Sequence, residues 1–215
     1  MASATAINTM ERREPAAFPR EAPAEEDFAR ARFYALISRM LARPVDAATL
    51  ENVRALTGDD SDFGRAIELL AGSARAATVE TAAEEFSALF FGMGAGGELL
   101  PYGSYYRTGL VYDKPLADLR GDLARLGIGA KADTTEPEDH IAFLCEVMHG
   151  LIAGTFGAPC SLGVQREFFH AHLEPWAGRF FADLEKAKSA RLYAPLGAIG
   201  RLLMAIETEG FAADA

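Results

Sequence analysis

The sequence contains little cysteine, no long apolar run and fewer basic than acidic residues. Its two cysteines, Cys145 and Cys160, cannot form a structural zinc site alone, and we expect reduced thiols. No apolar run approaches the roughly 18 residues of a membrane helix, so stable membrane insertion is not expected. The net charge of −10 disfavours nucleic acid and anionic membranes as ligands, and favours a basic partner.

The start of the chain also lacks the apolar segment that a secretory signal requires. Arg12 and Arg13 form a pair, but prolines and glutamates follow where that segment would have to stand. We therefore interpret residues 1–24 as a disordered N-terminal tail. The protein is expected to be cytoplasmic.

Most of the remaining chain has apolar residues at helical spacing, and alternating patterns typical of strands are scarce. The sequence therefore predicts an all-α protein, an irregular helical bundle. Residues 128–136 are interpreted as a hinge between an N-terminal lobe, 25–127, and a C-terminal lobe, 137–215. The segments expected to be helical are about 25–41, 47–57, 61–70, 81–90, 115–126, 137–153, 162–172, 176–189 and 192–209.

Two pairs of residues have the spacing of a capping box. In this motif, side chains at the beginning of a helix accept hydrogen bonds from free backbone N–H groups there. Thr81 precedes Glu84, and Thr135 precedes Glu138. We expect helices to begin at both threonines, with Pro137 in the first turn of the second helix.

The residues best suited to bind a ligand lie in the segment Glu136-Pro137-Glu138-Asp139-His140. Carboxylates at a helix start are favoured by its exposed N–H groups, so they have an ordinary structural explanation. His140 precedes an apolar stripe and would lie beside a carboxylate at its end. Composition and spacing alone favour the structural interpretation and leave the functional one open.

This segment resembles the E-P-x-D-H signature of the TorD/DmsD family of redox enzyme maturation chaperones, a NarJ-like group. Two further regions are similar to family motifs and occur in the same order along residues 25–210. They are Phe90-Phe91-Gly92 followed by Pro101-Tyr102-Gly103-Ser104-Tyr105, and His170-Ala171-His172-Leu173-Glu174-Pro175-Trp176 followed by Phe180, Phe181 and Tyr193.

The resemblance implies a TorD-like fold of two lobes and a non-catalytic chaperone without a cofactor of its own. The implied partners are the twin-arginine leader peptide and the catalytic subunit of a molybdoenzyme, of the formate dehydrogenase or S-/N-oxide reductase type. Asp139, with Glu136 or Glu138, would meet the arginines, and aromatic side chains would cover the apolar part. The implied leader-binding residues are Phe91, Pro101, Tyr102, Ser104, Tyr105, Tyr106, Glu136, Glu138, Asp139 and His140.

The sequence departs from the family pattern in one respect. Family members often carry tryptophan in the upstream region, whereas the only tryptophan here is Trp176, and tyrosines occupy the upstream positions. This departure concerns the contact surface and not the fold. A monomer or a domain-swapped dimer is compatible with the predicted hinge.

A di-iron helical bundle is the alternative interpretation. Glu146 with His149 and Glu167 with His170 are two Glu-x-x-His pairs on predicted helices, which is half of such a ligand set. The other half would have to come from glutamates such as Glu68, Glu84 or Glu85.

Overall fold

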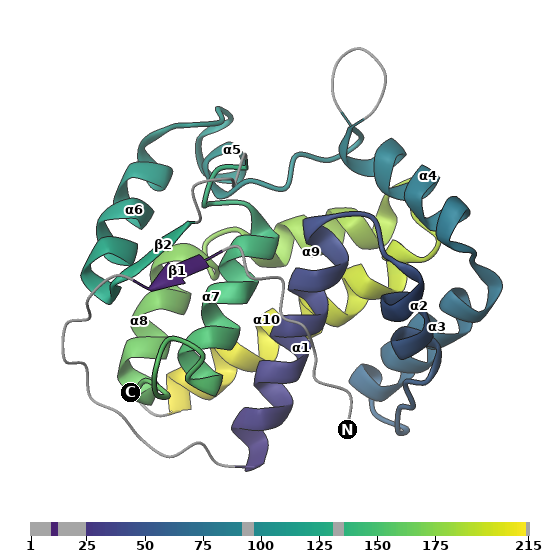
Figure 1. Cartoon of the computed structure of the whole chain (residues 1–215), viewed down its shortest axis with the longest axis horizontal. Coiled ribbons are helices and arrows are strands. Elements are labelled where there is room, and N and C mark those ends of the chain that lie inside the picture. Colours follow the sequence, from purple (N-terminus) through teal and green to yellow (C-terminus); the bar gives the residue numbers. More distant parts are fainter. Residues whose placement is uncertain (1–9, 13–24, 92–96, 131–135, 214–215) are drawn as a thin grey trace. The chain divides into compact units, whose positions relative to one another are not determined.

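The computed structural model describes residues 10–12, 25–91, 97–130 and 136–213 (Figure 1). The described residues form ten helices and one two-stranded ribbon, which confirms the predicted all-α class. None of the described helices is both long and apolar enough to cross a membrane. The helices are α1 (Glu25–Ala42), α2 (Ala47–Arg54), α3 (Asp62–Ala76), α4 (Val79–Phe90), α5 (Gly103–Thr108), α6 (Lys114–Leu126), α7 (Ile141–Ala153), α8 (Leu162–His172), α9 (Ala177–Lys186) and α10 (Tyr193–Ala213).

The ribbon lies where the sequence predicted a tail and a hinge. Strand β1 (Met10–Arg12) pairs antiparallel with β2 (Ile128–Ala130), with Met10 opposite Ala130. The rest of the predicted tail, and 131–135 of the predicted hinge, lie outside the described residues. Thr135, expected to cap a helix, is among these.

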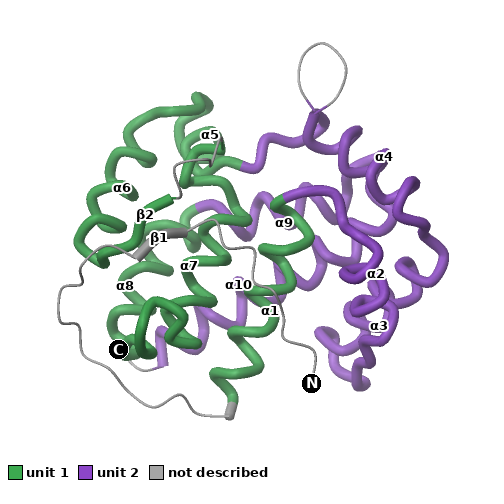
Figure 2. The backbone as a smooth tube through the Cα atoms, in the orientation of Figure 1, with its two compact units in different colours: residues 1–42, 102–175 green, residues 43–101, 176–215 purple. Residues whose placement is uncertain are grey.

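The described helices form two compact units, and each unit takes two separate stretches of chain (Figure 2). Unit 1 comprises Met1–Ala42 and Tyr102–Pro175, and unit 2 comprises Arg43–Pro101 and Trp176–Ala215. These boundaries differ from those of the predicted lobes. Each unit combines residues from before and after the predicted hinge, because helices distant in sequence pack together.

Unit 1 is centred on α7, against which α1 and α8 pack. All residues of α7 are buried except Glu146, His149 and Ala153, as expected for a helix that is apolar on every side. The His149 ring donates from Nδ1 to the Ala31 carbonyl at 3.0 Å, which ties α7 to α1. Helix α6 contacts α5, β2 and α8 in the same unit.

Unit 2 is centred on α10, which packs against α9 and α3. Glycines allow α9 and α10 to approach closely: a Cβ at Gly197 would lie 2.5 Å from the Glu185 nitrogen. A Cβ at Gly200 would meet the Phe181 ring at 2.2 Å. Arg201 then reaches the Glu185 carboxylate with two bonds, at 2.7 and 3.3 Å.

Two glutamates from outside α10 accept backbone N–H groups of its first residue and of the residues before it. Glu85 of α4 accepts from Arg191, Leu192 and Tyr193 at 2.7, 3.1 and 2.8 Å. Glu98 accepts from the N–H groups of residues 188 and 189, and the first of these bonds is the main reason that its pKa is lowered. The chain before α10 is thus fixed by carboxylates distant in sequence.

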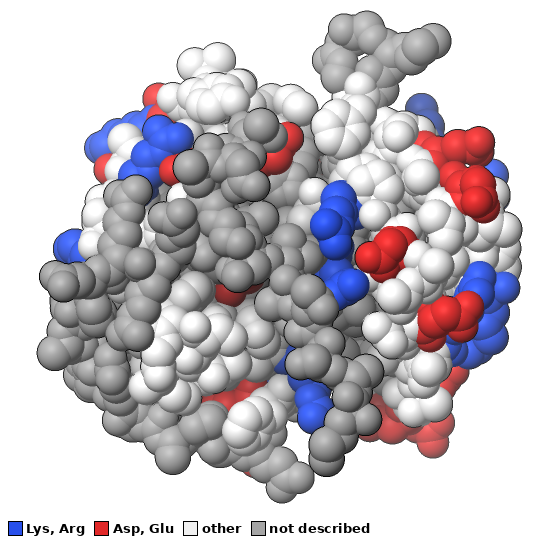
Figure 3. Space-filling view, in the orientation of Figure 1, with Lys and Arg blue, Asp and Glu red and all other residues white. Residues whose placement is uncertain are grey.

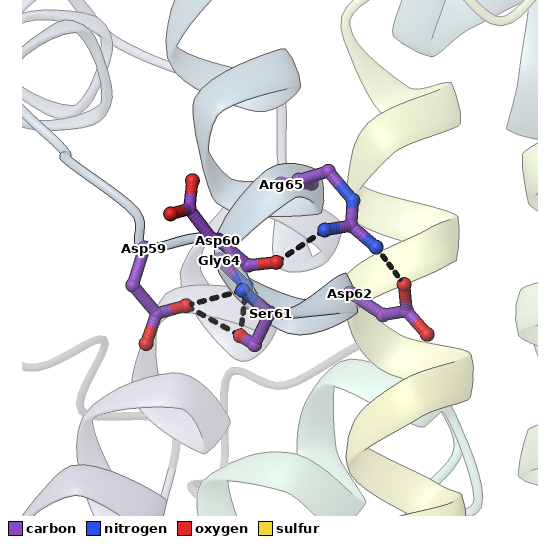
Figure 4. Close-up of polar contacts among 6 residues, drawn as sticks. All are labelled: Asp59, Asp60, Ser61, Asp62, Gly64 and Arg65. Carbon is purple, nitrogen blue, oxygen red and sulfur yellow. Dashed lines mark hydrogen bonds and ion pairs between the residues drawn. The ribbon is translucent and has the colours of Figure 1, made fainter.

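Helix α3 begins close to the predicted Ser61 (Figure 4). The Ser61 hydroxyl accepts from the Gly64 N–H at 3.0 Å, which caps the helix. The Asp59 carboxylate accepts from the Ser61 N–H at 3.0 Å, and Arg65 bonds to Asp62 and to the Asp60 carbonyl. The carboxylates of Asp59 and Asp62 in Figure 4 are therefore explained by the start of this helix.

Two predicted helix starts are wrong. Helix α4 begins at Val79, and its capping box pairs Thr78 with Thr81, so that Thr81 stands inside the helix. Helix α7 begins at Ile141 after the cap residue His140, four residues beyond the predicted Pro137. At both helix starts a residue other than the predicted one supplies the cap: Thr78 for α4 and His140 for α7.

Candidate functional site

Within unit 1, the chain at Tyr102 runs beside the chain at His140. The two residues form an isolated antiparallel bridge, and the Gly103 N–H donates to the Asp139 carbonyl at 2.9 Å. The structure therefore brings together two regions that the motifs had singled out separately, about 35 residues apart in sequence.

Asp139 faces inward from this bridge. It is only 2 % exposed, and its Oδ2 accepts from the Ser104 N–H at 2.7 Å. That bond satisfies a free N–H in the first turn of α5, a helix whose cap residue Tyr102 makes no side-chain cap bond. The other oxygen, Oδ1, and the buried Ser104 hydroxyl have no hydrogen-bond partner within the described residues.

His140 is the cap of α7 and also a ring neighbour of Tyr102. Its Nδ1 accepts from the Ala142 N–H at 3.1 Å, so this nitrogen carries no proton. The ring centroids of His140 and Tyr102 are 5.4 Å apart in an edge-on arrangement. Burial lowers the pKa of His140 to about 4, which keeps the imidazole neutral near pH 7.

Glu136 and Glu138 are partly exposed and each has one partner. The Tyr102 hydroxyl donates to Glu136 Oε2 at 2.5 Å. Burial and this carboxylate together raise the pKa of Tyr102. Glu138 Oε2 bonds to the Arg120 guanidinium of α6 at 2.8 and 2.9 Å, and Arg120 lies more than half exposed.

The remaining predicted residues differ in exposure. In unit 1, Tyr105 is exposed and packs edge-on against the half-buried Tyr106, with ring centroids 5.9 Å apart. In unit 2, Phe91 is exposed and Pro101 is buried. Eight of the ten predicted residues therefore belong to unit 1, and these two belong to unit 2.

Unit 1 also has a run of exposed apolar residues that was not predicted from the sequence. Leu110, Val111 and Tyr112 follow one another in the turn between α5 and α6, and all three are exposed. The signal was available, since three large apolar residues stand between Gly109 and Asp113 where no helical period continues. Tyr112 lies close enough to Tyr102 and Arg120 to contribute to the pKa of both.

The described residues give the di-iron alternative no support. They contain no group of three or more His, Cys, Asp or Glu side chains placed to bind a metal ion. His170 bonds to Glu174 at 2.6 Å, Glu167 is exposed, and His149 bonds to a backbone carbonyl. Glu85 accepts backbone N–H groups at the start of α10.

Comparison with known proteins matches residues 56–182, more than half of the chain, to the family described as nitrate reductase delta subunit. Chaperone protein TorD of Vibrio atlanticus is 27% identical over 123 residues, which are 54% of this chain and 57% of that protein. TorD of Aliivibrio fischeri is 36% identical over 91 residues, 38% and 41% of the two chains. The chain thus spans about half the length of the curated relatives it matches.

A solved structure, of an Archaeoglobus fulgidus protein assigned to redox enzyme maturation, has the same fold. The TM-score is 0.54 at 22% sequence identity, over 82% of this chain and 93% of that one. The resemblance to TorD seen in the motifs is confirmed by these matches. The chain belongs to the nitrate reductase delta subunit family, with a TorD-like all-α fold.

Proposed function

We propose that this protein is a cytoplasmic chaperone for the maturation of a molybdopterin-dependent oxidoreductase. It binds the twin-arginine leader peptide of that enzyme, its apo form, or both, before cofactor insertion and export. It catalyses no reaction and needs no cofactor of its own. Family membership and the similarity to chaperones named TorD support this proposal.

The observation that carries the proposal is the group of acidic residues at 136–139 beside aromatic side chains in unit 1. A twin-arginine leader presents two guanidinium groups followed by an apolar segment. A receptor for it needs carboxylates, which bind guanidinium through charge-assisted bonds, next to an apolar surface. Tyr105 is the exposed aromatic residue of the predicted set in this unit.

The carboxylates have different roles in the proposed site. Glu136 and Glu138 are partly exposed, and each has one carboxylate oxygen bonded within the protein, so each can accept a guanidinium. Asp139 orders α5 through Ser104, and its Oδ1 has no hydrogen-bond partner within the described residues. His140 and Tyr102 fix the segment that presents the carboxylates. Ser104 and Tyr106 complete the set in unit 1 that we assign to leader binding.

The test is calorimetric titration of the whole chain with a twin-arginine leader peptide. We expect micromolar affinity, and we expect Glu138→Gln and Asp139→Ala each to weaken binding by about 1 to 3 kcal/mol, because each removes a charge-assisted contact or its support. Asp60→Asn is the matched control, since it removes one exposed carboxylate from unit 2 (Figure 4).

The unfolding free energy of each variant must be measured in parallel. A loss of affinity in Asp139→Ala that equals the loss in Asp60→Asn would remove Asp139 from the site. Failure of the wild-type chain to bind any twin-arginine leader would contradict the leader-binding proposal itself. Competition between the leader and a leaderless apo-enzyme, of the formate dehydrogenase or S-/N-oxide reductase type, separates the two proposed ligands.

A further inference from the structure

The turn between α5 and α6 exposes three consecutive large apolar side chains. Leu110 is 65% exposed, Val111 41% and Tyr112 68%. With Tyr105, four such residues lie within eight positions of the chain. Several large apolar side chains exposed in one short stretch of chain indicate an interaction site, whereas single exposed apolar residues need no explanation.

The turn has a defined backbone conformation. Gly109 ends α5 with φ of 81°, and Asp113 caps α6 through a bond to the Lys114 N–H at 2.7 Å. Tyr112 also adopts a left-handed conformation, with φ of 61°. That conformation is unfavourable for an aromatic residue, and such strain is concentrated at functional sites.

The charges near this turn specify what kind of ligand fits it. The turn joins α5, whose cap residue Tyr102 donates to Glu136, to α6, whose Arg120 bonds to Glu138. An apolar ligand segment on the turn would therefore have carboxylates close to one end. A second copy of the chain fits less well, because its net charge of −10 would repel an equally acidic copy.

We propose that Leu110, Val111 and Tyr112 form the docking surface for the apolar segment of the leader peptide. This inference rests on the proposed function and adds the part of the leader that the turn contacts. The arginines of the leader bind at Glu136 and Glu138, and the apolar residues that follow them in the leader cover the turn. The burial of large apolar side chains on both partners supplies the affinity.

Two peptides and two variants test the proposal. One peptide is an intact leader, and the other keeps its arginines but has Gly and Ser in place of the apolar segment. The variants are Leu110→Ser and Tyr112→Asn, because asparagine tolerates the left-handed conformation of Tyr112. Each variant should bind the intact leader about tenfold more weakly than the wild type, which is the loss of affinity expected on removing one large apolar side chain. Each variant should bind the polar peptide with the same affinity as the wild type.

Leu69→Ser is the matched control, since Leu69 of α3 is 63% exposed and belongs to unit 2. Wild-type affinity for the intact leader in both turn variants overturns the inference and leaves the proposed function standing. Absence of leader binding by the wild type overturns both. Light scattering measures whether the chain forms a dimer. If the wild type is a dimer and Leu110→Ser is a monomer, the turn is a contact between two copies and the inference is overturned.

Discussion

His140 has two structural roles, and both require a neutral ring. Its Nδ1 accepts the Ala142 N–H at the start of α7, and its ring packs against Tyr102. A proton on Nδ1 would replace that acceptor with a donor and would place a charge among buried groups. The cap of α7 therefore depends on the protonation state of His140.

The stability of the protein should accordingly depend on pH through His140. Its pKa is about 4 in the folded chain, below the ordinary value near 6.5, so the unfolded chain binds the proton more readily. The stabilisation is fully present above pH about 6.5 and is lost as the pH falls toward 4, by up to about 1.4 kcal/mol per pH unit.

Urea unfolding between pH 7 and pH 4 measures this dependence. His140→Asn is the control variant, because its side chain still accepts at a helix start but does not titrate. The difference in unfolding free energy between wild type and variant should shrink or reverse as the pH falls. A difference that stays constant across this range would show that the pKa of His140 is the same in the folded and the unfolded chain, and would contradict the prediction.

The sequence predicted this segment but not the orientation of its side chains. The spacing identified Glu136, Glu138, Asp139 and His140 together. It could not separate the buried Asp139 from the partly exposed glutamates, because the partner of Asp139 is a backbone N–H 35 residues away. Local patterns contain no information on such a bond.

The start of α10 is fixed from another element. Glu85 of α4 accepts three consecutive N–H groups at this start, while the adjacent Glu84 points to solvent. A carboxylate at a helix N-terminus satisfies free donors and interacts favourably with the helix dipole. Neighbouring glutamates on one helix thus differ completely in their structural role.

Substituting each of these glutamates tests that difference. Glu85→Ala should lower the unfolding free energy by about 2 to 3 kcal/mol, because several N–H groups lose a charged acceptor. Glu84→Ala should change it by less than about 0.5 kcal/mol, as is usual for exposed positions. Guanidinium unfolding of both variants gives the comparison. Equal effects in the two variants would refute the role of Glu85.

Helical periodicity predicted most elements, and the misses have physical causes. The expected segments at 115–126 and 162–172 agree closely with α6 and α8. Helix α5 was not predicted, since six residues are too few to show a period and its first turn depends on Asp139. The ribbon was missed because three-residue strands have no recognisable alternation.

At the scale of the whole molecule, net charge should control how fast a leader binds. The chain carries −10 and the leader is basic, so their attraction accelerates the encounter and weakens as salt screens it. We expect the association rate to fall several-fold between about 50 mM and about 500 mM salt. Stopped-flow fluorescence with a labelled leader measures this rate. A leader with glutamine in place of its arginines is the control, and equal salt dependence for the two peptides would contradict the electrostatic explanation.

The division into units could not be predicted from the sequence. Periodicity identifies the buried face of α1 or α10 but not the helix that covers it. The pairing of α1 with α7, and of α3 with α10, joins helices whose centres lie well over a hundred positions apart. The predicted hinge was placed where the local pattern breaks, whereas the contacts divide the chain elsewhere.

This interleaving has a consequence for the order of folding during synthesis. Unit 1 has all its segments once Pro175 has left the ribosome, whereas unit 2 must wait for α9 and α10. Until then, α3 lacks the helix α10 that packs on it, and Phe86 and Phe90 of α4 lack the Tyr193 ring. The bridge between Tyr102 and His140, together with the exposed turn after α5, can therefore form while the rest of the protein is still being made.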